Sequence, residues 1–145
     1  MGLLSAPISD RGLAHLASLQ HVKTLDLAGS TITDRGLEHI AKLNCLESLH
    51  LKGKDITDEG MKHVAHISKL RELQLHETSV TDDGIACLID LSNLECLKLP
   101  EAFTDGGCKH LKRMKSLKVV FSAKARLSLT AQTELRTDLP GVALH

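Results

Sequence analysis

The sequence is nearly free of aromatic residues: its 145 positions include no tryptophan, no tyrosine and only two phenylalanines. Hydrophobic residues still make up 42% of the chain, so a core can form, but it must consist mainly of Leu, Ile, Val and Ala. A purely aliphatic core suits many small, similar slots better than a few large anchors. The composition therefore favours a chain built from repeated units.

A net charge is also absent, because 18 Lys and Arg residues balance 18 Asp and Glu residues. The chain as a whole therefore has no general electrostatic attraction for nucleic acid or membranes. No apolar run approaches the length that spans a bilayer, and residues 1–4 are too short for a signal peptide. The four cysteines show no CxxC spacing, which favours reduced thiols and a cytoplasmic location.

What the sequence does contain is one phrase in five copies. It reads ISDRGLAHL from residue 8, ITDRGLEHI from residue 32 and ITDEGMKHV from residue 56, and it returns near residues 80 and 103. The spacing is 24 residues three times and then 23. Such a period predicts a stack of similar units. We expect one domain over residues 1–145, closed by a half-repeat over residues 127–145.

Each unit changes its hydrophobic period partway through. Leu49 and Leu51 alternate with polar residues, which predicts a short strand with one buried face. Met61, Val64 and Ala65 then follow helical spacing. A strand, a turn and a short helix cannot bury their apolar faces alone, so we expect stacked units that share one core.

The repeated phrase lies where the strand gives way to the helix, and its polar residues suit that position. Thr57 can cap the helix with its hydroxyl, and Asp58 brings negative charge to the positive end of the helix dipole. We expect this helix-start role to account fully for the recurring aspartate. Gly60 is a poor helix former, so its recurrence indicates that neighbouring units approach closely there.

The spacing Leu46-x-x-Leu49-x-Leu51, followed five residues later by Ile56, resembles the leucine-rich repeat. The ITDxGL phrase is similar to the ribonuclease-inhibitor-like and cysteine-containing varieties, whose 24-residue copies are common in bacterial proteins. The resemblance implies an α/β fold: a right-handed leucine-rich-repeat solenoid with a parallel β-sheet on its concave face and short helices on its convex face. It also implies a non-enzymatic protein–protein interaction module.

The later units depart from the pattern. Pro100 should end the fourth strand early, because proline cannot donate to a strand ladder. In the fifth unit, the sequence LKVVFS puts Ser122 where a leucine is expected. This favours a slip of register that would bury Val119 and Phe121 instead of Val120.

A column of His and Cys residues recurs along the helices: His15, His39, His63, Cys87 and His110. The column lies two residues after the buried helix position, about 200° around the helix, so it should point outward into solvent. Outward-pointing side chains on the convex side should be too far apart to share one ion. We therefore predict no metal site and no cofactor. Since no nucleophile has an oriented base either, we predict no catalytic residue and no enzyme activity.

The strand positions between the leucines vary from copy to copy, unlike the helix phrase. Neighbouring strands lie about 4.8 Å apart, so these side chains should form one lattice on the concave face. We predict that this lattice binds a partner protein; the plainer alternative is a merely soluble sheet face. The predicted contact residues are Asp26, His50, Lys52, Glu72, Gln74, His76 and Lys98.

The charge distribution leaves a second function open. Residues 54–105 include 11 acidic and 5 basic residues, whereas residues 106–126 include seven basic residues and no acidic one. The basic segment 109–126 could bind nucleic acid or another polyanion, although it lacks the interleaved aromatic residues typical of base stacking. A substrate-recognition part of a ubiquitin ligase is a further alternative, but there is no room for an adaptor-binding segment before residue 8.

The start of the array raises a separate question. Leu3 already fits a strand slot, with no polar cap before it. An uncapped end exposes core. We therefore expect that the chain is a fragment, or that it associates with a partner through its N-terminal end.

Overall fold

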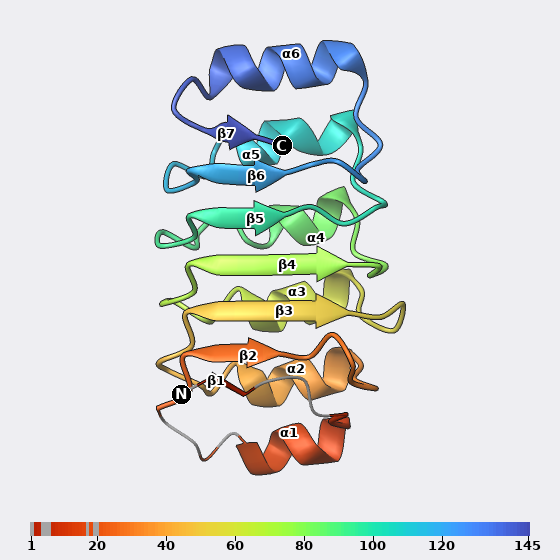
Figure 1. Ribbon diagram of the computed structural model, residues 1–145, viewed down its shortest axis with the longest axis vertical. Coiled ribbons are helices and arrows are strands. Elements are labelled where there is room, and N and C mark those ends of the chain that lie inside the picture. The colour runs from red at the N-terminus through yellow and green to blue at the C-terminus, as the bar shows by residue number, and fades with distance from the viewer. Residues whose placement is uncertain (1, 4–6, 17, 19–20) are drawn as a thin grey trace.

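Seven short strands stack into one parallel sheet that follows the order of the chain. The computed structural model describes residues 2–3, 7–16, 18 and 21–145. Among these residues every strand pairs in parallel with its neighbours in sequence (Figure 1). The strands are β1 (Gly2–Leu3), β2 (Thr24–Asp26), β3 (Ser48–Lys52), β4 (Glu72–His76), β5 (Cys96–Lys98), β6 (Val119–Phe121) and β7 (Ala143–Leu144).

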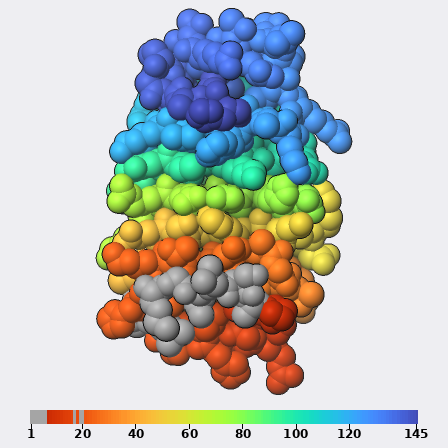
Figure 2. All heavy atoms as spheres, viewed as in Figure 1, coloured from red at the N-terminus to blue at the C-terminus, as the bar shows by residue number. Residues whose placement is uncertain are grey.

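Short helices form a second layer on one side of the sheet, and the last helix closes the C-terminal end (Figure 1). Each of the first four helices packs against the helix of the next coil. In space-filling form the coils lie as successive bands from one end of the chain to the other (Figure 2). The helices are α1 (Asp10–Leu16), α2 (Asp34–Ile40), α3 (Asp58–Val64), α4 (Asp82–Ala86), α5 (Cys108–Leu111) and α6 (Leu129–Asp138), with a 3-10 turn η1 (Asp105–Gly107) before α5.

Apolar residues at equivalent positions of each coil form the core between the two layers. One leucine per strand aligns in register across β2 to β5, and all four are fully buried: Leu25, Leu49, Leu73 and Leu97. Helix residues at the matching position close the core from the other side: Leu37, Met61 and Ile85. The predicted α/β solenoid, with alternating strands and helices around an aliphatic core, is confirmed.

The strand register continues unchanged into the irregular fifth unit, so the predicted slip is wrong. Val120 pairs with Leu97 and is fully buried, while Phe121 pairs with Lys98 and is 40% exposed. A slip of one residue would turn every side chain of β6 to the opposite face and expose Val120. The last interval of the repeat is 23 residues instead of 24, and the turn after β5 is the part that is one residue shorter. Strand β5 itself ends at Lys98, as Pro100 predicts.

The recurring aspartate joins neighbouring coils. The Asp34 carboxylate accepts hydrogen bonds from Thr57 N–H at 2.8 Å and from Thr57 Oγ1 at 2.6 Å. The same pair of bonds, here called the Asp–Thr clamp, links Asp10 to Thr33, Asp58 to Thr81 and Asp82 to Thr104. The threonine hydroxyls also cap their helices, as predicted. The prediction that the helix dipole accounts fully for the aspartates is wrong, because each carboxylate also binds the next coil.

The recurring glycine makes room for the Asp–Thr clamp. A Cβ atom on Gly60 would lie 2.4 Å from Oδ1 of Asp34 and 2.6 Å from Cδ1 of Leu37. The equivalent glycines have the same relation to the preceding aspartates: Gly36 to Asp10 and Gly84 to Asp58. The predicted close approach between coils is confirmed, and the clamp carboxylate is the group that approaches.

The first and last coils are joined to the array in the same way as the others. Strand β1 aligns Leu3 with Leu25, so Leu3 occupies the predicted strand slot. At the other end β7 pairs with β6, and Asp105 accepts a hydrogen bond of 2.8 Å from the N–H of Ser128 just before α6. Among the described helices, none combines the length and the apolar character needed to cross a membrane.

Candidate functional site: the outer face of the sheet

The side of the sheet that points away from the helices, here called the sheet face, is a lattice of polar side chains. All seven predicted contact residues lie on this face, where they alternate with the buried leucines, and each is half-buried. Backbone register arranges them as Asp26, His50, Gln74 and Lys98 in a central row, Lys52 and His76 in the row beside it, and Glu72 on the other side. Their role in binding stays a prediction.

His50, Glu72 and Gln74 form a hydrogen-bonded cluster at the centre of the sheet face. His50 Nε2 lies 3.3 Å from Glu72 Oε1, and Gln74 Nε2 donates to the same oxygen at 2.8 Å. Gln74 Nε2 also lies 3.1 Å from His50 Nε2. A neutral ring that carries its proton on Nδ1 accepts from Gln74, whereas a protonated ring donates to Glu72. The amide and the carboxylate therefore compete for one ring nitrogen.

Glu72 holds this cluster together, because both of its carboxylate oxygens are engaged. Ser48 Oγ donates to Oε2 at 3.1 Å, while Gln74 and His50 contact Oε1. Burial alone would raise the pKa of Glu72, but hydrogen bonds from Gln74 and Ser48, together with the adjacent His50, outweigh it. The pKa therefore lies below its ordinary value of 4.5. Glu72 is ionised at neutral pH and keeps negative charge in the middle of the sheet face.

Ser48, His50 and Asp26 lie in the order of a hydrolase triad, a juxtaposition that was not predicted from the sequence. The distances are long: Ser48 Oγ is 3.4 Å from His50 Nε2, and His50 Nδ1 is 4.0 Å from Asp26 Oδ2. The Ser48 hydroxyl instead donates a hydrogen bond to the Glu72 carboxylate. An acyl-transfer site also needs free backbone donors for an oxyanion, whereas strand N–H groups are committed to the sheet. The arrangement fits recognition better than catalysis.

A second charged cluster lies at the carboxyl end of β4. His76 Nε2 is 3.1 Å from Glu77 Oε1, and Glu77 Oε2 is 3.2 Å from Lys52 Nζ. With Glu101 included, three ligand atoms lie within 4.8 Å of one another. Two lysines also lie 3.7 and 3.8 Å from the Glu101 carboxylate. Because these lysine charges would oppose a divalent cation, the cluster does not by itself indicate a metal site, and the prediction that the chain holds no metal stays a prediction.

The column of His and Cys residues on the helices is less exposed than predicted. His15 is exposed, but the other four members are half-buried. Neighbouring helices pack side by side and shade this column, which the geometry of a single helix does not include. His110 Nδ1 is buried without a hydrogen-bond partner among the described residues. The column is therefore not the solvated face that the sequence predicts.

Three of the four cysteine thiols are made less reactive by burial. All four are free, with Cys108 buried and the others half-buried. Burial raises the pKa of the Cys87, Cys96 and Cys108 thiols. A raised pKa leaves less of the nucleophilic thiolate at neutral pH. These thiols therefore suit packing better than chemistry.

The basic segment 109–126 does not form one patch. Lys109 lies in α5, and the other charges lie in the turns before and after β6. Three of them pair with carboxylates: Lys112 with Asp138, Lys118 with Glu95 and Lys124 with Glu101. A phosphate backbone needs a continuous track of cations. The dispersed and partly neutralised segment offers no such track, so the geometry does not favour the polyanion alternative.

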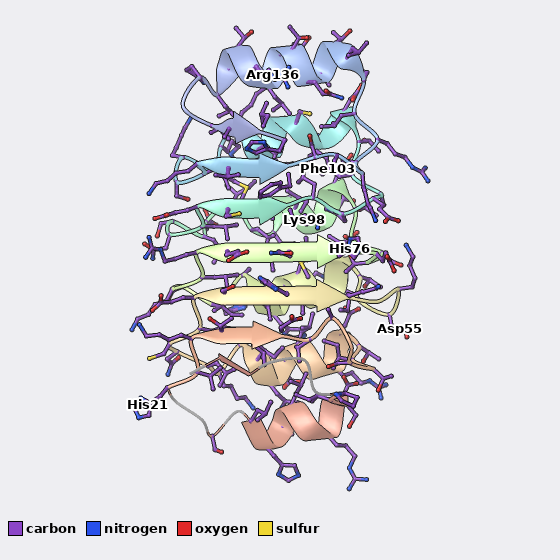
Figure 3. All side chains as sticks on the ribbon, in the orientation of Figure 1. His21, Asp55, His76, Lys98, Phe103 and Arg136 are labelled. Carbon is purple, nitrogen blue, oxygen red and sulfur yellow. The ribbon has the colours of Figure 1, made fainter. Side chains whose placement is uncertain are left out.

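A pocket of about 200 Å³ opens on the sheet face between β4, β5 and the turn after β6. Leu75 and Leu99 line it although their side chains are buried, and Phe121, a residue that is 40% exposed, lines it as well. Lys98 also lines it, one strand away from His76 (Figure 3). The pocket was not predicted, because the expected register slip turned Phe121 inward. Strict continuation of the leucine register would have put this ring beside Lys98.

Known proteins with similar features agree with this geometry. A family model described as "Leucine Rich repeat" matches residues 18–41 and 42–65. No curated relative matches the chain in sequence. The structure of internalin C2 from Listeria monocytogenes has a TM-score of 0.64 and 26% identity, and the match covers 91% of this chain and 55% of that one. A leucine-rich-repeat protein of Leptospira interrogans has a TM-score of 0.64 and 20% identity, with 99% and 34% covered.

The chain thus spans 55% and 34% of the lengths of these two similar structures. The family match over two successive units agrees with the period of the sequence. The structural matches, which cover most of the chain, agree with the stacked parallel strands and alternating helices. On this combined evidence the fold is that of a leucine-rich-repeat solenoid, and the repeated sequence is similar to the leucine-rich repeat.

Proposed function

We propose that the chain binds a partner protein through its sheet face. Leucine-rich-repeat folds are typical protein-interaction modules, and the proteins that carry them are generally non-enzymatic scaffolds. The observation that supports the proposal best is the alignment of different polar side chains in rows, on a frame whose other positions repeat. Because adjacent strands hold these side chains in place before binding, little conformational freedom is lost on association. The cytoplasmic location expected from the sequence is part of this proposal.

The charges of the sheet face suit a polar, specific contact. Negative charge gathers at Asp26 and Glu72, while Lys98 carries positive charge two strands from His50. Alternating charge of this kind selects partners by complementarity more than it adds affinity. No observation favours the ubiquitin-ligase alternative over this reading.

The test is a charge change at the centre of the sheet face that leaves the fold intact. Glutamate at position 74 is unsuitable, since the Gln74 amide lies 2.8 Å from the Glu72 carboxylate. Lysines at positions 50 and 74 would lie opposite each other and beside Lys98, but Asp26 and Glu72 lie next to them and offset this repulsion, so the double variant His50→Lys/Gln74→Lys should fold. The matched control is Glu38→Lys on the exposed side of α2, which adds the same net charge.

Both variants are first compared with the unaltered chain by thermal unfolding. Each is then used as bait in a lysate of the source organism, and captured proteins are quantified by mass spectrometry. We expect proteins that bind the unaltered chain and the Glu38→Lys control but are lost from the double variant. Retention by the double variant together with loss from the control would put binding on the helix side and overturn the proposal.

A further inference from the structure

The pocket beside Lys98 has the size of a side chain, and its exposed apolar lining comes from Phe121 and Ala123. Its volume of about 200 Å³ is smaller than the sites of about 300–1,000 Å³ that enclose whole small molecules. Phe121 is one of two large apolar side chains exposed among the described residues. The Phe121 ring stacks on His145, with the ring centroids 5.2 Å apart, and the part of the residue that stays exposed leaves apolar surface that a partner could cover.

Lys98 is the charged group of this pocket that lacks an opposite charge. Lys98 is half-buried, and its side chain makes no hydrogen bond or ion pair within the described part of the chain. The other charged lining residues are engaged: Glu101 lies 3.7 Å from Lys124, and His76 lies 3.1 Å from Glu77. A half-buried ammonium without a partner favours an incoming anion, because each gains an opposite charge.

We propose that this pocket receives an apolar side chain of the partner, and that Lys98 pairs with a carboxylate directly beside that side chain. The inference rests on the proposed function and adds the chemistry of the partner's contact segment: an aliphatic or aromatic residue next to Asp or Glu. Buried apolar anchors of this kind commonly dominate the affinity of an interface. The charge next to the anchor then determines which segments bind.

The direct test uses a peptide probe and does not require the partner. The ¹⁵N-labelled full chain is titrated with N-acetyl-Leu-Asp amide and, separately, with N-acetyl-Leu-Asn amide. We expect saturable shift changes at Lys98, Phe121 and Ala123, with a dissociation constant of about 1–10 mM for so small a ligand. The uncharged Asn probe should bind about threefold more weakly, as expected for a partly exposed ion pair.

Three surface variants locate the site. Ala123→Trp should fill the pocket and abolish binding, and Phe121→Ser should weaken it for both probes. Lys98→Gln should remove the preference for Asp over Asn. The control Lys42→Gln removes a lysine that is exposed and lies between α2 and β3, away from the pocket, and it should leave both probes unaffected. Equal affinity for the two probes, or shift changes that lie away from the pocket, would overturn the inference.

The partner experiment separates this inference from the proposed function. A partner that is lost from His50→Lys/Gln74→Lys but kept by Ala123→Trp and Lys98→Gln would refute the pocket alone. If the peptide binds the pocket and the double variant still keeps the partner, the proposed role of His50 and Gln74 is refuted and the pocket is not.

Discussion

The Asp58 carboxylate accepts two hydrogen bonds from Thr81 in the next coil, each 2.7 Å long, one from the backbone N–H and one from the hydroxyl. The Thr81 hydroxyl in turn accepts a hydrogen bond from the N–H of Asp83 and caps α4. One aspartate therefore serves the start of its own helix, the start of the next helix and the contact between coils.

Replacing Asp58 with Ala should lower the free energy of unfolding by about 1–2 kcal/mol, because two donors on Thr81 lose a charged acceptor. Asp55→Ala is the control: Asp55 is an exposed acidic residue of the same coil that makes no hydrogen bond in the described part of the chain. Its replacement should change the free energy by less than about 0.5 kcal/mol. Urea denaturation measures both, and equal effects would contradict the role assigned to the Asp–Thr clamp.

Gly60→Ala should destabilise the protein, although Ala alone favours a helix over Gly by about 1 kcal/mol. The new Cβ would lie 2.4 Å from Asp34 Oδ1 and would push this carboxylate away from Thr57. In an Asp34→Ala background the same substitution should cost less, because the clamp is already absent. A double-mutant cycle measures this coupling, and strictly additive effects would argue against it.

Leu73→Ala should lower the free energy of unfolding by about 2–5 kcal/mol, since Leu73 is fully buried at the centre of the array. Each coil contacts only its neighbours, so the two halves should also lose cooperativity and unfold over a broader transition. Leu129→Ala, at a position that is 82% exposed, is the matched leucine control. A sharp transition at the original midpoint would show that this strand is not part of the core.

Glu72 should contribute to acid unfolding. Its folded pKa lies below the ordinary value of 4.5, so the ionised form stabilises the fold above that pH. The contribution is lost as the pH falls from 4.5 through the lowered folded value. Glu72→Gln should therefore flatten the pH dependence of the unfolding free energy in this range. Gln74→Ala should move the loss to higher pH by removing a donor to Glu72; an unchanged acid limb in both variants would contradict the assignment.

Thr78→Val should leave stability unchanged or raise it by about 1 kcal/mol. The Thr78 side chain is 1% exposed, and its Oγ1 has no hydrogen-bond partner among the described residues. Replacing a buried hydroxyl that lacks a partner with a methyl group of similar shape removes a desolvation cost. The conservative exchange Thr57→Val should instead destabilise, because Thr57 both donates to Asp34 and caps α3. Thermal unfolding of the two variants compares them directly.

The sequence predicted those features that depend on one coil at a time. The alternation around Leu49 and Leu51 is a property of a single strand, and it correctly assigned His50 to the sheet face. The recurring glycine indicated that the coils approach closely, but the hydrogen bonds between coils were missed. The bond from Asp58 to Thr81 joins residues 23 positions apart, and nothing in one helix indicates it.

The same limit explains the errors around the candidate site. The register of β6 is decided by its pairing with β5. The presence of Ser122 at a position where a leucine is expected was therefore a poor guide to that register. The cluster of His50, Glu72 and Gln74 depends on which side chains face each other across strands. Periodicity predicts which face a residue occupies, but not which neighbours it contacts on that face.

Different groups join neighbouring coils at the two ends of the strands. At the carboxyl ends of the strands the Asp–Thr clamps bind backbone N–H groups. At the amino ends backbone hydrogen bonds join the coils, such as Glu47 N–H to the Lys23 carbonyl at 2.8 Å, and exposed ion pairs such as Lys23–Glu47 at 2.9 Å lie beside them. Dissolved salt screens exposed charges far more than it weakens short hydrogen bonds to backbone. Salt therefore weakens the exposed ion pairs and leaves the hydrogen bonds that join the coils at both ends of the strands. We expect rising ionic strength to lower the free energy of unfolding by no more than about 1 kcal/mol for each exposed pair, while the coils stay joined.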